Sequence, residues 1–246
     1  MSYDDPRLAV VYDVDNPDGP DHDYFRSFVG GATADVVTDL GCGTGILTVT
    51  LARAGRTVIG IDPAPAMLER AAARPGGRGV EWLLGTSEQI APESTDVVLM
   101  TGNVAMHILG DDWHRTLADI ARGLRPGGRL AFETRNPLAR AWESWNHPLT
   151  ERETPVGRLR ESGTTSPPDE SGVVTTHYVN EFVEDGLIIE GTQRLQFRDL
   201  ERVRTDLTSA GLEVQHVWRD WHRTPFSNTS LEPLMVFETR QSATRA

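Results

Sequence analysis

The sequence predicts an α/β fold in which one mostly parallel β-sheet carries helices on both faces. Two runs rich in β-branched residues, 36–40 and 57–62, each contain an acidic residue at or near their end, which is typical of buried parallel strands that lead into a ligand site. In the segment 124–130 a proline and two glycines end a predicted helix and turn the chain into a further strand. At 246 residues the chain suits one domain of this type with an insertion.

The first strand leads into a glycine loop. Gly41, Gly43 and Gly45 stand at alternate positions directly after it, and glycine lets such a loop turn sharply and lets a ligand approach the backbone closely. A dinucleotide-binding fingerprint would need a further glycine where Ile46 stands, so this spacing disfavours pyrophosphate at the helix N-terminus. Cys42 is the single cysteine, which excludes an internal disulfide, and we expect it to be a small side chain that fits the loop.

The later strands end in polar residues as well. Asp62 ends the second strand, about as far from the glycines as a carboxylate that accepts hydrogen bonds from two ribose hydroxyls should be. The same residue can be the N-cap of the helix that follows, and the two roles are compatible. Strands are also expected at 80–84 and 95–100, and they end in the short turns 85–87 and 101–103. These turns are expected at one edge of the sheet, where ligands of open α/β sheets bind.

Three motifs in this order resemble those of the class I S-adenosylmethionine-dependent methyltransferases: D-x-G-x-G-x-G at 39–45, Asp62, and L-x-P-G-G-x-L at 124–130. The resemblance is clear over residues 36–136 and loose over 199–240. It implies a Rossmann-like, seven-stranded, mostly parallel sheet with an antiparallel last strand, and S-adenosyl-L-methionine as the cofactor. The cofactor-binding residues that it implies are Asp39, Gly41, Cys42, Gly43, Gly45, Asp62, Pro63, Met67, Thr86, Ser87, Thr101, Gly102 and Asn103.

One position departs from the pattern of this family. Its members usually have an acid after the glycine that follows the third strand, and this acid accepts from the adenine amino group, whereas this chain has Thr86. A neutral hydroxyl is a weaker acceptor than a carboxylate, so adenine recognition is expected to depend more on backbone groups around Ser87. Met67 would lie against the adenine by the same resemblance, and the alternative is that it belongs to the core.

Four parts are expected along the chain: an N-terminal cap at 1–35, the cofactor-binding core at 36–136, an insertion at 137–198, and the C-terminal part of the core at 199–246. The cap has turn chemistry but no strong periodicity, and we expect it to be flexible.

The insertion after the fifth strand is expected to contain a short helix at 138–145 and a β-hairpin made of 173–183 and 187–197. The polar stretch 150–172 is expected to be a loop. Because the insertion starts at the carboxyl edge of the sheet, we expect it to form a lid over the substrate.

Methyl transfer from a sulfonium needs a well-aligned acceptor and at most one general base. His107 follows the fourth strand by a few residues and is the first candidate, the alternative being a histidine with a structural role at a helix start. His222 is the second candidate, because Asp220 lies two positions before it, and on a strand the two would face the same way as an orienting pair. Glu133 and Arg135 can meet a polar acceptor or can form a mutual ion pair.

Aromatic residues gather around the expected acceptor site. Tyr12 is expected to close over the cofactor or to pack on the flank of the sheet. Trp142, Trp145 and Trp221 suit a flat organic substrate or a cation, and the alternative is that they are core residues.

Net charge and composition limit the classes of partner that the sequence favours. A formal charge of −12 argues against a nucleic-acid partner, because affinity for phosphates needs lysines and arginines. The sequence has no apolar run long enough for a membrane span, no leader-like start and no metal-ligand spacing, so we expect a cytoplasmic protein without a metal. Monomer and homodimer both stay open.

The function predicted is transfer of a methyl group from S-adenosylmethionine to an oxygen or nitrogen of a small organic molecule. Two alternatives stay open at this point. One is a catalytically silent protein that binds the same cofactor, and the other is a nicotinamide-dependent oxidoreductase, which the glycine spacing disfavours.

Overall fold

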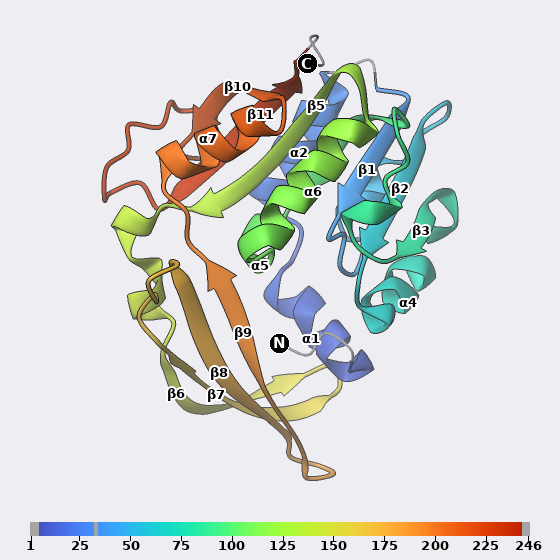
Figure 1. The fold of residues 1–246 in the computed structure, drawn as a ribbon. Helices are drawn as coiled ribbons and strands as arrows, with labels where there is room; N and C mark the ends of the chain where they lie inside the picture. The colour runs from blue at the N-terminus through green and yellow to red at the C-terminus, as the bar shows by residue number, and fades with distance from the viewer. Residues whose placement is uncertain (1–4, 32–33, 243–246) are drawn as a thin grey trace.

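A seven-stranded sheet forms the centre of the computed structural model, which describes residues 5–31 and 34–242 (Figure 1). The strand order is β10-β11-β5-β4-β1-β2-β3. β11 runs antiparallel to both β5 and β10, and the other neighbours pair in parallel. The predicted seven-stranded, mostly parallel sheet with an antiparallel last strand is therefore confirmed. The strands are β1 (Val36–Leu40), β2 (Thr57–Asp62), β3 (Glu81–Leu84), β4 (Thr95–Met100), β5 (Leu124–Arg135), β10 (Leu212–Trp218) and β11 (Leu234–Gln241).

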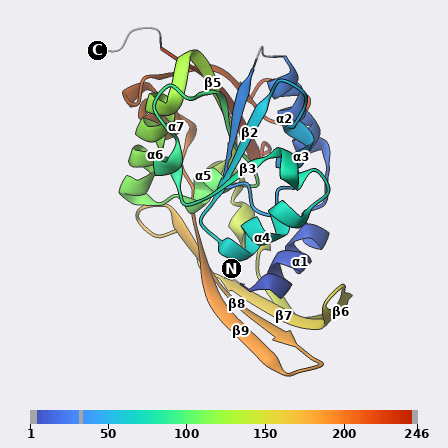
Figure 2. The ribbon, with the colours of Figure 1, turned by 90° about the vertical axis from the view of Figure 1, so that its right-hand side faces the viewer.

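Helices cover both faces of this sheet (Figures 1 and 2). On one face, the buried residues Trp113, Leu117 and Ile120 recur at helical spacing and pack on the sheet together with Val203 and Leu207. The other face is covered through buried aromatic and aliphatic side chains of the N-terminal part of the chain. The helices are α2 (Pro20–Gly30), α3 (Thr48–Leu51), α4 (Pro65–Ala73), α5 (Val104–His107), α6 (Gly110–Gly123) and α7 (Leu200–Ser209), with 3₁₀ turns η1 (Gly77–Gly79) and η2 (Ser87–Gln89).

The N-terminal cap is helical, so the expectation of a flexible segment was wrong for its described residues. α1 (Pro6–Asp15) starts with Asp5, whose side chain accepts from the Arg7 backbone N–H, and α2 has a proline in its first turn. Tyr24 and Phe25 of α2 are buried against the sheet. Two short helices separated by a turn carry too little periodicity for the sequence to show them.

The insertion forms a second, four-stranded antiparallel sheet in the order β6-β7-β8-β9. The expected hairpin is present as β8 (Val173–Phe182) and β9 (Leu187–Gln196). The prediction of a loop at 150–172 was wrong, because most of this stretch belongs to β6 (His147–Thr154) and β7 (Gly157–Thr165). The short helix expected at 138–145 consists of two 3₁₀ turns, η3 (Pro137–Ala139) and η4 (Ala141–Ser144).

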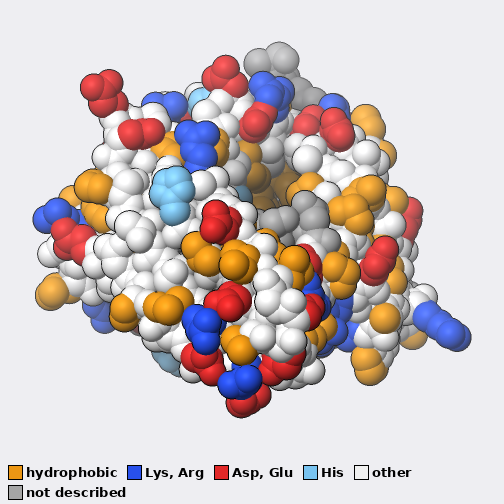
Figure 3. Space-filling model, turned by 90° about the horizontal axis from the view of Figure 1, so that it is seen from below, with side chains coloured by type: hydrophobic (Ala, Val, Ile, Leu, Met, Phe, Trp, Pro, Cys, Tyr) orange, Lys and Arg blue, Asp and Glu red, His pale blue; other side chains and the backbone are white. Residues whose placement is uncertain are grey.

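Charged pairs explain why β6 and β7 do not look like strands in the sequence. Arg152 Nε lies 2.8 Å from Glu161 Oε1 across the two strands, and Arg160 pairs with Glu151 and Glu181. Acidic and basic side chains are interspersed on the face of the molecule seen from below (Figure 3). These strands are therefore stabilised by cross-strand ion pairs rather than by apolar alternation.

Two apolar contacts join the insertion to the rest of the molecule. Leu8 and Val11 of α1 pack with Leu159 and Phe182. Met106 of α5 packs in a cluster with Trp142, Val174, Leu195 and Phe197. In both views the small sheet lies beyond the edge where the central strands end, with α1 beside it (Figures 1 and 2).

Candidate active site

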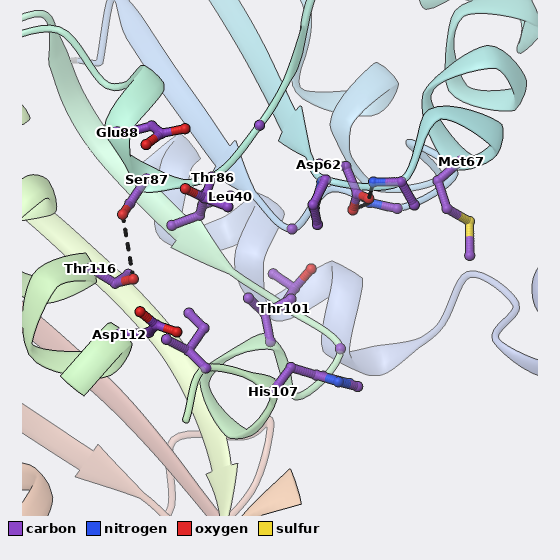
Figure 4. Close-up of a pocket in the computed structure, with 18 of the residues that line it drawn as sticks. Leu40, Asp62, Met67, Thr86, Ser87, Glu88, Thr101, His107, Asp112 and Thr116 are labelled. Atoms are coloured by element: carbon purple, nitrogen blue, oxygen red, sulfur yellow. Dashed lines mark hydrogen bonds between the residues drawn. The ribbon is translucent and has the colours of Figure 1, made fainter. Parts of the chain in front are cut away.

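A cavity of about 580 Å³ lies at the carboxyl ends of β1, β2 and β4 (Figure 4). Its lining comes from the strand-end turns, α1, α4, and the α5–α6 region. Ten of the residues predicted from the sequence line it: Tyr12, Gly41, Gly43, Asp62, Pro63, Met67, Thr86, Ser87, Thr101 and Gly102. His107 lines it as well.

The three glycines of the loop have different neighbours, although all three have positive φ angles of 75°, 53° and 72°. A Cβ atom on Gly41 would lie 2.4 Å from a Val104 methyl carbon, and one on Gly45 would lie 2.7 Å from the Trp82 ring. At Gly43 the nearest atom is Tyr12 Cε1, at 3.9 Å. Only Gly43 therefore leaves open space on the side where a ligand would approach.

Asp62 holds the glycine loop and closes one side of the cavity. It is 7% exposed, and its two oxygens accept from the Gly43 N–H at 2.8 Å and the Ala64 N–H at 2.9 Å. Burial raises the pKa of this carboxyl, and the two backbone hydrogen bonds oppose that rise. The expected N-cap is not formed, because α4 begins at Pro65 with Ala64 in the cap position. Each oxygen keeps a further lone pair, so the carboxylate can still accept from two vicinal hydroxyls.

Three residues expected to bind the cofactor do not line this cavity. Asp39 is 1% exposed and accepts from Thr48 Oγ1 at 2.6 Å, and burial raises its pKa to about 6. Gly45 packs on Trp82, so Asp39 and Gly45 shape the loop from behind. Cys42 lines a smaller neighbouring cavity instead, and burial raises the pKa of its thiol.

A fourth expected residue, Asn103, fixes the turn after β4 and does not line the cavity. Its φ is +63°, a left-handed conformation, and its N–H donates to Glu133 Oε1 while its side-chain oxygen accepts from Arg135 Nε at 3.2 Å. Glu133 and Arg135 thus both bind Asn103, and the expected mutual ion pair is not formed. Burial raises the pKa of Glu133 to about 7. The neighbours Thr101 and Gly102 are held at the cavity by this turn.

Tyr12 separates the main cavity from a second one of about 240 Å³. The two cavities share Tyr12, Gly41, Thr101 and Gly102, and the second also has polar lining that includes Asp21 and His22. The Tyr12 hydroxyl lies 3.5 Å from the place of a Cβ on Gly102. Burial raises the pKa of Tyr12 to about 12, so the phenol stays protonated at neutral pH.

Asp13 fixes the helix that carries Tyr12. Its Oδ1 accepts from Thr44 Oγ1 of the glycine loop at 2.5 Å, and its Oδ2 accepts from Arg70 Nε at 2.6 Å and Arg74 Nη2 at 2.7 Å. With 12% of its side chain exposed, this carboxylate is a mostly buried junction between α1, the loop and α4. The sequence analysis missed it, since its partners are distant along the chain.

The two histidines differ sharply in placement. His107 lies at the end of α5, and burial lowers its pKa to about 4, below the unperturbed value near 6.5. It is neutral at pH 7 and is a weaker base than the sequence analysis assumed. His222 is exposed in a turn after β10, and its backbone N–H, rather than its ring, donates to Asp220 Oδ1 at 2.9 Å. The strand placement that would pair Asp220 with the ring of His222 was wrong.

The tryptophans pack as core residues. The rings of Trp142 and Trp145 lie 4.7 Å and 5.6 Å from that of Phe197, centre to centre. Trp221 packs against Tyr24 and Phe25. In the described part of the chain, none of the three lines either cavity, so of the four aromatic residues expected at the substrate only Tyr12 is there.

Within residues 5–31 and 34–242, no group of three or more His, Cys, Asp or Glu side chains is arranged to hold a metal ion. No helix in these ranges is long and apolar enough to cross a membrane.

Comparison with known proteins identifies the class. Residues 38–132 match the family model described as methyltransferase domain. An uncharacterized methyltransferase of Mycobacterium tuberculosis is 42% identical over 101 residues, which are 41% of this chain and 40% of that protein. The cypemycin N-terminal methyltransferase of a Streptomyces species is 28% identical over 208 residues, 82% of each chain.

A solved structure agrees with the fold. The CcbJ methyltransferase from Streptomyces caelestis superposes with a TM-score of 0.73 at 24% identity and covers 93% of this chain and 98% of its own. Residues 38–132 thus match a methyltransferase domain, and the fold of the whole chain is that of the S-adenosylmethionine-dependent methyltransferases. The chain spans about two fifths of the length of the mycobacterial relative.

Proposed function

We propose that the protein transfers a methyl group from S-adenosylmethionine to a nitrogen or oxygen of a small organic acceptor. The observation that carries the proposal is a single cavity lined by the ligand-facing glycine Gly43, the buried carboxylate Asp62 and the neutral imidazole of His107. This cavity suits a nucleoside whose two free hydroxyls meet Asp62. The neutral imidazole of His107 lines the same cavity.

The residues present fit the cofactor. Asp62 would accept from the two ribose hydroxyls, and Gly43 would let the cofactor lie against bare backbone. The second cavity, across Tyr12, would take the amino-acid end, where the Asp21 carboxylate can meet the ammonium group. When bound, the cofactor supplies an electrophilic methyl group and a neutral thioether leaving group. The work left to the chain is alignment of the acceptor and exclusion of water.

His107 narrows the acceptor chemistry. A base whose conjugate acid has a pKa of about 4 gives little help in removing a proton from an alcohol. It stays neutral, however, so its ring nitrogen can accept a hydrogen bond from the N–H of an uncharged amine and orient the amine toward the methyl group. The methylated ammonium can lose its proton to water after it leaves the site. An amine that enters the buried site uncharged therefore suits this imidazole better than an alcohol does.

The names of the relatives also support a nitrogen acceptor. The relative named an N-terminal methyltransferase matches over 82% of its length, whereas a relative named ubiquinone biosynthesis O-methyltransferase matches over 50% of its own. The formal charge of −12 disfavours a nucleic-acid acceptor.

The test is turnover with a panel of small amines and alcohols. Purified protein and S-adenosylmethionine are incubated with each compound, and mass spectrometry follows S-adenosylhomocysteine and an acceptor that has gained one methyl group. We expect product with at least one amine, and none with the Asp62→Ala protein. Cofactor binding without turnover on any acceptor class would instead support the catalytically silent alternative.

A further inference from the structure

The far end of the main cavity lies beside β3 and α6. Asp62 of β2 pairs in register with Leu84 of β3, so the turn 85–87 follows one strand further along the sheet edge than the carboxylate Asp62. From the other side, Asp112, Thr116 and Asp119 line the cavity from one face of α6 at spacings of four and three residues. Ser87 and Thr116 lie together at the end opposite Met67 and His107 (Figure 4).

The hydrogen of the Ser87 hydroxyl is used in a hydrogen bond to Asp119. The Ser87 oxygen lies 2.8 Å from Asp119 Oδ2 and 3.4 Å from Thr116 Oγ1. A hydroxyl carries one hydrogen, and the shorter contact to a carboxylate is the stronger bond, so the hydrogen points to Asp119. Since the other Asp119 oxygen is 3.0 Å from Arg122 Nη1, both oxygens are held in place.

The oxygen of Ser87 therefore offers only lone pairs to a ligand. Ser87 is 5% exposed and lines the cavity, so a ligand group that meets it must bring an N–H or O–H of its own. The nearest alternative acceptor in this turn, Thr86, is a neutral hydroxyl with no carboxylate behind it among the described residues.

We propose that Ser87 and Asp119 together select an adenine base, with Ser87 accepting a hydrogen bond from the exocyclic amino group and Asp119 fixing the direction of the Ser87 hydroxyl. This inference rests on the proposed function. Ser87 is the binding residue, and Asp119 is a positioning residue that acts through it. The carboxylate therefore acts on the base indirectly, through Ser87, and it comes from helix α6 and not from the turn after β3.

A base with a 6-oxo group tests this directly. Calorimetry would compare S-adenosylhomocysteine with S-inosylhomocysteine. The 6-oxo oxygen of the second compound replaces the amino group, so it would face the Ser87 oxygen with no hydrogen between the two. We expect the wild-type protein to prefer the adenine compound by roughly tenfold or more, the scale of one unsatisfied buried polar group.

The two variants should change this preference in different ways. Ser87→Ala should bind S-adenosylhomocysteine roughly tenfold more weakly and lose most of the preference. In Asp119→Asn the amide oxygen should face Arg122, which leaves the amide NH₂ toward Ser87. The Ser87 hydroxyl then loses its acceptor and can donate to a ligand, so the preference should fall to about threefold or less. Because the two residues act through one bond, Ser87→Ala should change little further in the Asp119→Asn protein.

The matched control is Asp112→Asn, since Asp112 is an exposed carboxylate that lines the same cavity from the same helix and pairs with Arg115. It should keep the wild-type preference. A preference that is unchanged in both Ser87→Ala and Asp119→Asn overturns the inference and leaves the proposed function standing. Equal weakening of both ligands in the variants also overturns it, because that marks a purely structural role. Failure of the wild-type protein to bind either ligand would overturn the proposed function as well.

Discussion

The cavity is enclosed by two regions that are held together in different ways. The wall consists of the strand-end turns 41–45, 62–64, 85–87 and 101–103, and its main bonds are from backbone N–H groups to a neighbouring strand or carboxylate, such as Gly41 N to Ile61 O at 2.7 Å. The cover consists of α1 and α5, which line the cavity, together with the insertion 137–198, which packs on them and contributes no lining residue. It is joined by side-chain packing between segments far apart in the sequence. Changes in the wall should therefore act on cofactor affinity, and changes in the cover should act on transfer.

The largest effect is expected at the centre of the wall. Asp62→Ala removes the acceptor of the Gly43 and Ala64 N–H groups and the acceptor proposed for the two ribose hydroxyls, so S-adenosylmethionine affinity should fall by roughly a hundredfold or more. Calorimetry measures it, with Asp111→Ala, an exposed acid outside the wall, as the control. Wild-type affinity in the Asp62→Ala protein would show that this carboxylate does not hold the cofactor.

His107 belongs to the cover, so its loss should spare the cofactor. His107→Ala should lower the single-turnover rate by roughly tenfold, the scale of one lost orienting hydrogen bond, with cofactor affinity within twofold of wild type. His114→Ala, on a half-exposed histidine of α6, is the control. Because the pKa of His107 is about 4, its neutral form persists on acidification, and its contribution to the rate should fall only as the pH approaches 4. A rate within a fewfold of wild type would remove His107 from the chemistry.

Asp13 tests the joint between the two regions. Asp13→Asn weakens the bonds from Thr44, Arg70 and Arg74 to a mostly buried carboxylate, so it should lower the unfolding free energy by about 2 kcal/mol and cofactor affinity roughly tenfold. The control is Asp185→Asn, which breaks an exposed pair with Arg7 of the same helix, lines neither cavity and should change stability and affinity far less. Denaturant unfolding and calorimetry of both proteins check this, and equal effects would contradict the role of Asp13.

The smallest effect is expected at Glu133 behind the wall. Burial raises the pKa of its carboxyl from 4.5 to about 7, so in that pH window the folded protein keeps a proton that the unfolded chain releases. The stability that this group contributes is therefore lost as the pH rises from about 4.5 to 7. Glu133→Gln should remove this loss, so its unfolding free energy relative to wild type should rise between pH 5 and pH 8. A stability difference that is the same at both pH values would contradict the raised pKa.

The wall could be predicted from the sequence better than the cover, for physical reasons. Gly43 and Asp62 were placed correctly at the cavity because a glycine after a buried strand and an acid at the end of the next strand have fixed positions at a sheet edge. The junction at Asp13 and the Ser87–Asp119 bond join residues more than 30 positions apart, and no local pattern shows them.

Errors outside the wall have the same origin. Trp221 was expected at the substrate and packs on α2, because the sequence shows that a ring is apolar but not which surface it meets. The strands around Arg152 and Arg160 were missed because their charges pair across the sheet. The low pKa of His107 results from its burial in the folded chain, which a sequence pattern does not show.

One matched pair of glycines tests the division between wall and cover most directly. Gly43 of the wall has a φ of +53° and Gly186 of the β8–β9 turn has a φ of +68°, and no atom crowds a Cβ closer than 3.9 Å at either place. Alanine at each position carries a similar backbone strain of about 1 kcal/mol, but only the methyl group at position 43 enters the space proposed for the cofactor. Titration with S-adenosylmethionine should show affinity lowered at least thirtyfold for Gly43→Ala and within twofold of wild type for Gly186→Ala. Equal affinities in the two proteins would contradict the account.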